Sequence, residues 1–190
     1  VEDAALLLEC IAGPDPYDPR QTNLPPLPKY TDGLDKEIVG VRIGILKEGF
    51  GDQDAEPDVE GAVREAALSL RKLGAKVEEI SIPEHKTSLK LLAPLLFIAN
   101  DFVVRTYGGI FYQGYYDTHF TTAFSSFLKS RAHLLPPRIK QWLLLGGLLG
   151  CQAYQYYGKA HNLRRLVQRG YNDAFNHVDC VVFPTTPMKA

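Results

Sequence analysis

Apolar and polar residues follow two different periods along this chain, and these periods predict its elements. Apolar residues alternate with polar or small ones at 40–46, which is typical of a strand. They recur at helical spacing over 57–73, where Gly74 ends the pattern. A second alternating stretch at 76–82 predicts another strand. A strand, an amphipathic helix and a strand favour a right-handed βαβ unit with parallel strands, and therefore an α/β fold.

The rest of the chain is organised around this unit. Residues 1–12 have the spacing of a helix, and residues 14–37 carry six of the thirteen prolines, which indicates an extended connecting loop. Residues 86–177 are mostly helical in pattern and rich in aromatic side chains, and 180–185 is predicted to be a buried strand that returns to the sheet. The expected order is β-α-β, a helical excursion and a final strand.

Both ends of the sequence lack features that a finished domain would have. The helix at 1–12 has no preceding Ser, Thr, Asp or Asn to cap its first amide groups. Residues 184–190 leave the last predicted strand as a loop without a closing element. We therefore interpret residues 1–190 as an incomplete, C-terminal portion of one larger domain.

Composition narrows the class of protein. The chain has 190 residues, of which 45% are hydrophobic and 23% charged, and this balance is typical of a globular protein. The three widely separated cysteines form no disulfide framework, which favours a reducing, cytoplasmic location. The longest apolar stretches are interrupted by Pro94 and by Gly146 and Gly147, so no transmembrane segment is expected.

Charge is distributed unevenly along the chain. Residues 1–101 hold 19 acidic and 11 basic side chains, whereas residues 102–190 hold 3 acidic and 10 basic ones. The basic residues of the second half are scattered and follow no recognition motif for nucleic acid. We therefore expect pairing between the two halves and no nucleic-acid binding.

Three patterns suggest chemistry but have simpler interpretations. The glycines at 44–51 match neither dinucleotide nor P-loop spacing and are flanked by acids that would repel phosphate. Ser125 and Ser126 lie near Lys129, but no glycine-rich turn is present to form an oxyanion hole, so solvated helix residues are favoured. The five histidines are isolated from one another and from cysteine, and no metal site is expected.

An aromatic and glycine-rich stretch at 107–116 is a better candidate for ligand contact. Glycine lets the backbone bend, while Tyr and Phe supply an apolar wall with polar tips. Filling of the core explains the same composition, so both interpretations stay open.

Several stretches, taken in order, resemble the amidase signature family, specifically the C-terminal part of amidases associated with nitrile metabolism. The residues that carry the resemblance are Val1–Leu8, Ile11–Gly13, Asp18–Arg20, Val41–Gly51, Glu56–Val59, Ala62–Ala66 and Pro184–Met188.

The resemblance implies an α/β/α enzyme with a mixed β-sheet covered by helices, which hydrolyses carboxylic amides to acid and ammonia without a cofactor. In that family a Ser nucleophile works with a second Ser on a cis peptide and a Lys. The segment that carries these residues lies upstream of the helix at 1–12, and nothing in this chain matches it. The resemblance therefore implies no catalytic residue here, and an N-terminal catalytic portion of the same polypeptide as a partner.

The resemblance also implies that this portion forms the wall of the acyl pocket. The predicted substrate-binding residues are Tyr112, Tyr115, Thr185, Thr186 and Met188. They would select a small-molecule amide by shape and take no part in the chemistry.

Two alternatives and one assembly state stay open. The chain could belong to the amidase-like subunit that amidates misacylated tRNA, or it could be a catalytically inactive module that binds a ligand or docks on a membrane surface. A homodimer is also compatible with the sequence.

Overall fold

The computed structural model describes the chain except residues 19–20, 22–23, 108–114 and 190. Its helices are α1 (Glu2–Ile11), α2 (Pro57–Ser69), α3 (His85–Arg105), α4 (Thr118–Arg131), α5 (Pro137–Gln152) and α6 (Gln155–Phe175). Its strands are β1 (Arg42–Leu46), β2 (Lys76–Ile80) and β3 (Cys180–Val182). Short 3₁₀ turns lie at Tyr30–Gly33, Lys47–Gly49, Leu70–Leu73 and Ala132–Leu134.

The chain divides into two compact units. One comprises residues 1–37 and 102–140, and the other comprises residues 38–101 and 141–190. The second unit holds all three described strands, and it is called the sheet unit below.

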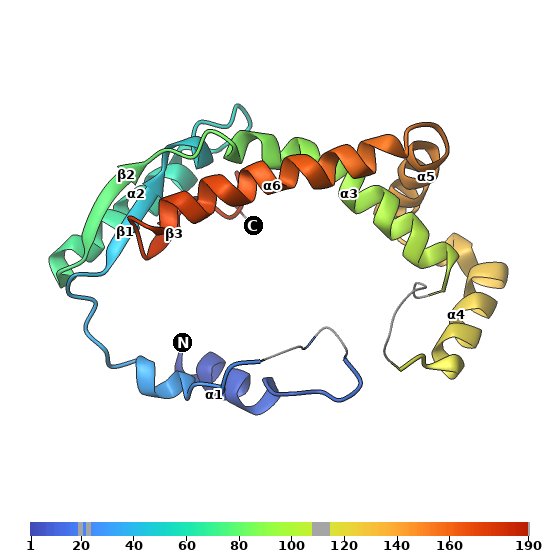
Figure 1. The fold of residues 1–190 in the computed structure, drawn as a ribbon, viewed down its shortest axis with the longest axis horizontal. Coiled ribbons are helices and arrows are strands. Elements are labelled where there is room, and N and C mark those ends of the chain that lie inside the picture. The colour runs from blue at the N-terminus through green and yellow to red at the C-terminus, as the bar shows by residue number, and fades with distance from the viewer. Residues whose placement is uncertain (19–20, 22–23, 108–114, 190) are drawn as a thin grey trace. The chain divides into compact units, whose positions relative to one another are not determined.

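The sheet unit has an α/β fold with a small parallel sheet flanked by helices. The strand order is β2-β1-β3, and β1 pairs in parallel with both neighbours (Figure 1). Ile43 of β1 aligns with Val77 of β2 on one side and with Cys180 of β3 on the other. The predicted βαβ unit is therefore present, and the described strands are all parallel to one another.

One face of the sheet forms a compact core with α2. Ile43 and Ile45 are almost fully buried and cluster with Ala67 of α2 and Val77 of β2. Helix α2 begins at Pro57, whose fixed φ suits a first helical position, and the turn that follows it ends at Gly74 with a positive φ of 92°. The helical spacing predicted at 57–73 is thus an α-helix that tightens into a 3₁₀ turn.

The final strand differs from its prediction as a buried element. Cys180 is exposed and the two residues after it are only partly buried, because β3 lies at the edge of the described sheet and pairs with β1 alone. Aliphatic composition alone does not distinguish an edge strand from a central one.

Helix α3 also departs from the sequence-based expectation. The expected interruption at Pro94 is absent, and α3 continues through this residue for a total of 21 residues. A proline removes one amide donor and crowds the carbonyl four residues earlier, but it does not always end a helix. By length and composition α3 is the one described helix that could span a membrane, which is weak evidence since core helices pass the same test.

Helices α3 and α5 approach closely at Gly146. A Cβ atom at this position would meet the Phe97 carbonyl group and would lie 2.6 Å from the Cβ of Asp101, both on α3. The ring of Phe97 also lies 6.3 Å from that of Trp142, one turn earlier on α5. The absence of a side chain at Gly146 therefore sets the contact between these helices.

We expect Gly146→Ala to lower the free energy of unfolding in urea by about 1–3 kcal/mol, because the added methyl meets backbone rather than a flexible side chain. Gly150→Ala is the matched control on the same helix, where a Cβ has nothing within 4 Å. The control should be neutral or stabilising by up to about 1 kcal/mol. Equal effects of the two substitutions would contradict the close contact.

An ion pair joins the start of β1 to the turn before β3. The Arg42 guanidinium donates to Asp179 at 2.6 Å, and the Arg42 backbone N–H donates to the same carboxylate at 2.8 Å. These bonds lower the pKa of Asp179 to about 2. The folded state therefore favours the ionised carboxylate more than the unfolded chain does, where an aspartate pKa is about 3.9.

We expect the stability contributed by Asp179 to be complete above about pH 4 and to be lost as pH falls towards 2. The difference in free energy of unfolding between the native chain and Asp179→Asn should accordingly narrow over this range. Urea titrations at a series of pH values measure it, and a difference that does not change with pH would contradict the assignment.

Candidate functional site

The candidate site lies where the three parallel strands end. Because β1, β2 and β3 run in the same direction, the segments that follow them meet at one edge of the sheet. These segments are 47–50 after β1, 81–85 after β2 and 183–189 after β3. In open α/β sheets this edge is where ligands bind.

A half-buried carboxylate ties the first two segments together. Glu48 accepts a hydrogen bond from the Ser81 hydroxyl at 2.5 Å and another from the Ile82 backbone N–H at 2.8 Å. Desolvation raises the pKa of Glu48, but these hydrogen bonds outweigh it and the pKa is lowered. Glu48 is therefore ionised near neutral pH and fixes the position of the segment that precedes α3.

His85, the first residue of α3, joins the second and third segments. Its Nδ1 is 2.7 Å from the Tyr171 hydroxyl, and its ring lies edge-on to the Phe183 ring with centroids 5.0 Å apart. Burial lowers the pKa of His85, opposed by the negative charge of Glu48, and burial raises the pKa of Tyr171. A neutral imidazole and a protonated phenol are the forms that this hydrogen bond joins.

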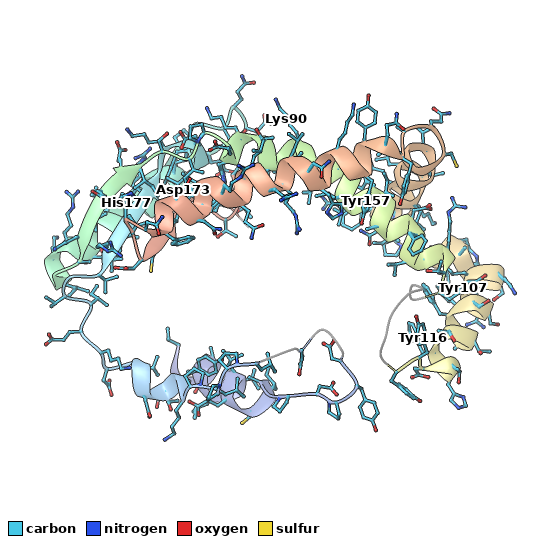
Figure 2. All side chains as sticks on the ribbon, viewed as in Figure 1. Lys90, Tyr107, Tyr116, Tyr157, Asp173 and His177 are labelled. Carbon is cyan, nitrogen blue, oxygen red and sulfur yellow. The ribbon has the colours of Figure 1, made fainter. Side chains whose placement is uncertain are left out.

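Helix α6 brings Tyr171 to this edge. Tyr157 and Asp173 lie near the two ends of α6 (Figure 2). Tyr171 precedes Asp173 by two residues and is therefore near the C-terminal end of the helix. The preceding Gly170 lets the helix approach: a Cβ there would lie 3.0 Å from Ile82 Cγ2 and 2.8 Å from a Glu84 carboxylate oxygen.

The segment 183–189, called the β3 loop below, is held at both ends. At its start, Phe183 packs so closely on Gly49 that a Cβ on the glycine would be 2.5 Å from the Phe183 Cβ. At its far end, the Pro187 carbonyl accepts a hydrogen bond of 2.8 Å from the Glu56 backbone N–H. The Lys189 ammonium group lies 2.5 Å from Asp58.

Three of the predicted substrate-binding residues lie together in the β3 loop. Thr185, Thr186 and Met188 are all exposed there, and the Thr186 hydroxyl donates to the Met188 carbonyl at 2.8 Å. Tyr115 belongs to the other compact unit, where its ring lies 5.5 Å from that of Tyr17. Tyr112 lies outside the described residues.

The serine and lysine residues of α4 form no nucleophilic site. Ser125, Ser126 and Lys129 line an open hollow of about 460 Å³. Within the described part of the chain, no hydrogen bond joins Lys129 to either serine hydroxyl, whereas an activated serine needs its base within hydrogen-bond reach. Among the same residues no group of three His, Cys, Asp or Glu side chains could hold a metal ion.

Comparison with known proteins assigns the chain to a family. The family model for amidases matches residues 1–190. The chain belongs to the amidase family. It is 36% identical over 195 residues to a glutamyl-tRNA(Gln) amidotransferase subunit of Cyanothece sp., an alignment that covers all of this chain and 39% of that relative. The chain thus spans about two fifths of the length of the curated relatives it matches.

Solved structures agree with this fold. One solved structure is a vestigial protein complex that reveals the evolutionary origins of an s-triazine catabolic enzyme. A chain of this complex is 27% identical to the present chain, with a TM-score of 0.66. The match covers 100% of the present chain and 35% of that one. A bacterial aryl acylamidase of the amidase signature family, 19% identical with a TM-score of 0.71, shares the fold over 98% of this chain and 35% of its own length. The relatives named here are not nitrile-metabolism amidases, so the finer part of the sequence resemblance is replaced by the family-level assignment.

Sequence reasoning missed His85, Glu48 and Tyr171. The histidines look isolated because no residue close to them in sequence could form a site with them. The partners of His85 are distant in sequence: Glu48 lies 37 residues before it and Tyr171 lies 86 residues after it. A usable signal was present: Glu48 and His85 each follow closely on a predicted parallel strand, and such positions converge on one edge.

We expect the pKa of His85 to lie below its ordinary value of 6.5 and to fall further in Glu48→Gln, since the lost negative charge no longer favours the imidazolium form. Histidine ring chemical shifts followed by NMR through a pH titration measure both effects. Glu78→Gln, on β2, is a control that should leave the titration unchanged. A pKa that rises in Glu48→Gln would contradict the site geometry.

Proposed function

We propose that this amidase-family chain forms the substrate-binding side of an enzyme that hydrolyses carboxylic amides to acid and ammonia. The observation that carries the proposal is the β3 loop, which is held at the carboxyl edge of the sheet and presents Thr185, Thr186 and Met188 to solvent. Family membership over residues 1–190 supports amide hydrolysis as the reaction.

The catalytic serines and lysine would come from sequence that precedes this portion in the family order. The serines of α4 lack a base within hydrogen-bond reach in the described part of the chain, which supports the assignment of the catalytic residues to the preceding sequence. In the family arrangement the lysine acts as a base when neutral or through the bridging serine. The cytoplasmic location and the homodimer remain parts of this proposal.

The β3 loop would select the acyl group of the amide. Met188 offers a flexible apolar side chain and the two threonines offer methyl groups beside hydroxyls, a combination suited to an aliphatic or aromatic acyl chain. The substrate-binding roles of Tyr112 and Tyr115 stay predictions from the sequence. A pocket of this kind discriminates by about 1–3 kcal/mol per methylene.

A second candidate function is favoured by the relatives. The 36% identity is to one subunit of a glutamyl-tRNA(Gln) amidotransferase, which supports a chain that releases ammonia from an amide donor for use on misacylated tRNA. Glutaminase activity that strictly requires a partner subunit would decide in favour of this function.

We expect activity when the chain replaces the matching segment of the Cyanothece relative. The chimaera should release ammonia from at least one member of a series of aliphatic amides, benzamide and glutamine, because the relative would supply the residues that precede this portion. The purified 190-residue chain alone should release none.

Two results would contradict the proposal. Amide hydrolysis by the chain alone would place the chemistry within these 190 residues. A chimaera that folds, as judged by circular dichroism and cooperative unfolding, but hydrolyses none of the amides, either alone or with the relative's partner subunits, would rule out the proposed role of the chain.

A further inference from the structure

A series of side-chain contacts connects α6 to the start of the β3 loop. Phe183 packs against the Gly49 backbone and its ring lies edge-on to the His85 ring, while 38% of the residue stays exposed. Because Gly49 carries no side chain to adjust, the position of Phe183 depends on where the His85 ring stands.

The His85 ring is itself held from α6. The backbone N–H of His85 donates to the Ile82 carbonyl at 2.9 Å, which fixes the main chain, but ring rotation is limited by the hydrogen bond between Nδ1 and the Tyr171 hydroxyl at 2.7 Å. The rings of His85 and Tyr171 also meet edge-on, with centroids 6.2 Å apart. Both side chains are only partly exposed, so water competes weakly for this hydrogen bond.

We propose that His85 and Tyr171 form a positioning pair that sets the place of the β3 loop and thereby the size preference of the enzyme among amides. This inference rests on the proposed function. The pair acts through Phe183, and the loop residues Thr185 and Thr186 follow it by two and three positions.

The far end of the β3 loop is anchored separately, so the His85–Tyr171 pair controls only the position of the near end. The Pro187 carbonyl and the Lys189 ammonium group are bound to the first turn of α2, so loss of the His85–Tyr171 hydrogen bond leaves that anchor intact. Displacement at Phe183 is then taken up by residues 184–186, which lie between the two anchors and include Thr185 and Thr186. These threonines would contact the acyl group.

The pair should affect substrate preference more than the chemical step. A pocket wall binds substrate and transition state alike, so its loss changes KM and the selectivity between substrates and leaves kcat nearly unchanged. A damaged fold would instead lower activity on all amides together.

The test uses Tyr171→Phe in the chimaera with the Cyanothece relative, which removes one hydroxyl and keeps the ring. The ratio of kcat/KM for a long-chain aliphatic amide to that for a short one should change by roughly 2- to 10-fold, the range expected for one neutral hydrogen bond. The kcat for the short amide should stay within about 2-fold.

Tyr157→Phe is the matched control. Tyr157 is also on α6 and its ring packs edge-on against His161 at 4.6 Å, but it lies at the opposite end of the helix from Asp173 (Figure 2). This substitution removes the same hydroxyl from a comparable tyrosine–histidine pair and should leave the selectivity ratio unchanged.

A double-substitution cycle tests whether the two residues act as one unit. His85→Ala combined with Tyr171→Phe should change the selectivity ratio no more than His85→Ala alone, because the hydroxyl acts only through the imidazole. Additive effects of the two substitutions would overturn the positioning role, as would a uniform loss of kcat with unchanged selectivity.

Hydrogen exchange on the 190-residue chain separates failure of this inference from failure of the proposed function. The backbone amides of Phe183, Thr185 and Thr186 should exchange faster in Tyr171→Phe and at the native rate in Tyr157→Phe. Faster exchange in Tyr171→Phe of the 190-residue chain, together with a chimaera that hydrolyses no amide, would overturn the proposed function and leave the positioning of the loop intact. Unchanged exchange would overturn the positioning pair whatever the activity.

Discussion

The pairing of β1 with both β2 and β3 in parallel is the constraint on which the sheet unit depends. Ile43 and Ile45 of β1 fill the core against α2, and they can do so only because each edge of β1 is covered by a neighbouring strand. A parallel arrangement also sends every strand's carboxyl end to the same side. Three segments that are far apart in the chain, 47–50, 81–85 and 183–189, consequently meet there.

Two side chains at this edge hold different segments in place. Glu48 fixes the segment after β2 through an ionised carboxylate, while His85 reaches the β3 loop through a neutral, partly buried ring. Glu48 keeps its negative charge because two hydrogen-bond donors compensate the cost of burial. His85 is neutral because burial disfavours a positive charge on a ring whose neighbours are the Tyr171 phenol and the Phe183 ring. These contacts hold the segments in fixed positions, which is compatible with the proposed role of the β3 loop as a pocket wall.

Much of the sheet unit could be predicted from the sequence, and the reasons are local. Alternation at 40–46 and 76–82, together with Pro57 and Gly74 around the helix between them, specified β1, α2 and β2 without knowledge of any distant contact. The edge position of β3 and the course of α3 through Pro94 were not predicted, because exposure and helix continuity depend on neighbours in space. The His85–Tyr171 pair was missed for the same reason, while the grouping of Thr185, Thr186 and Met188 in one loop follows from their adjacency in sequence.

The central claim is that the β3 loop forms a wall of the substrate pocket, and Met188 offers the most direct measurement because it is the only methionine in the chain. In the chimaera with the Cyanothece relative, its ¹³C-methyl NMR signal is assigned by its loss in Met188→Leu and followed during titration with an amide that the chimaera hydrolyses slowly. The account predicts that this signal shifts with the same concentration dependence as KM. A Met188 signal that does not change while the enzyme becomes saturated would contradict it.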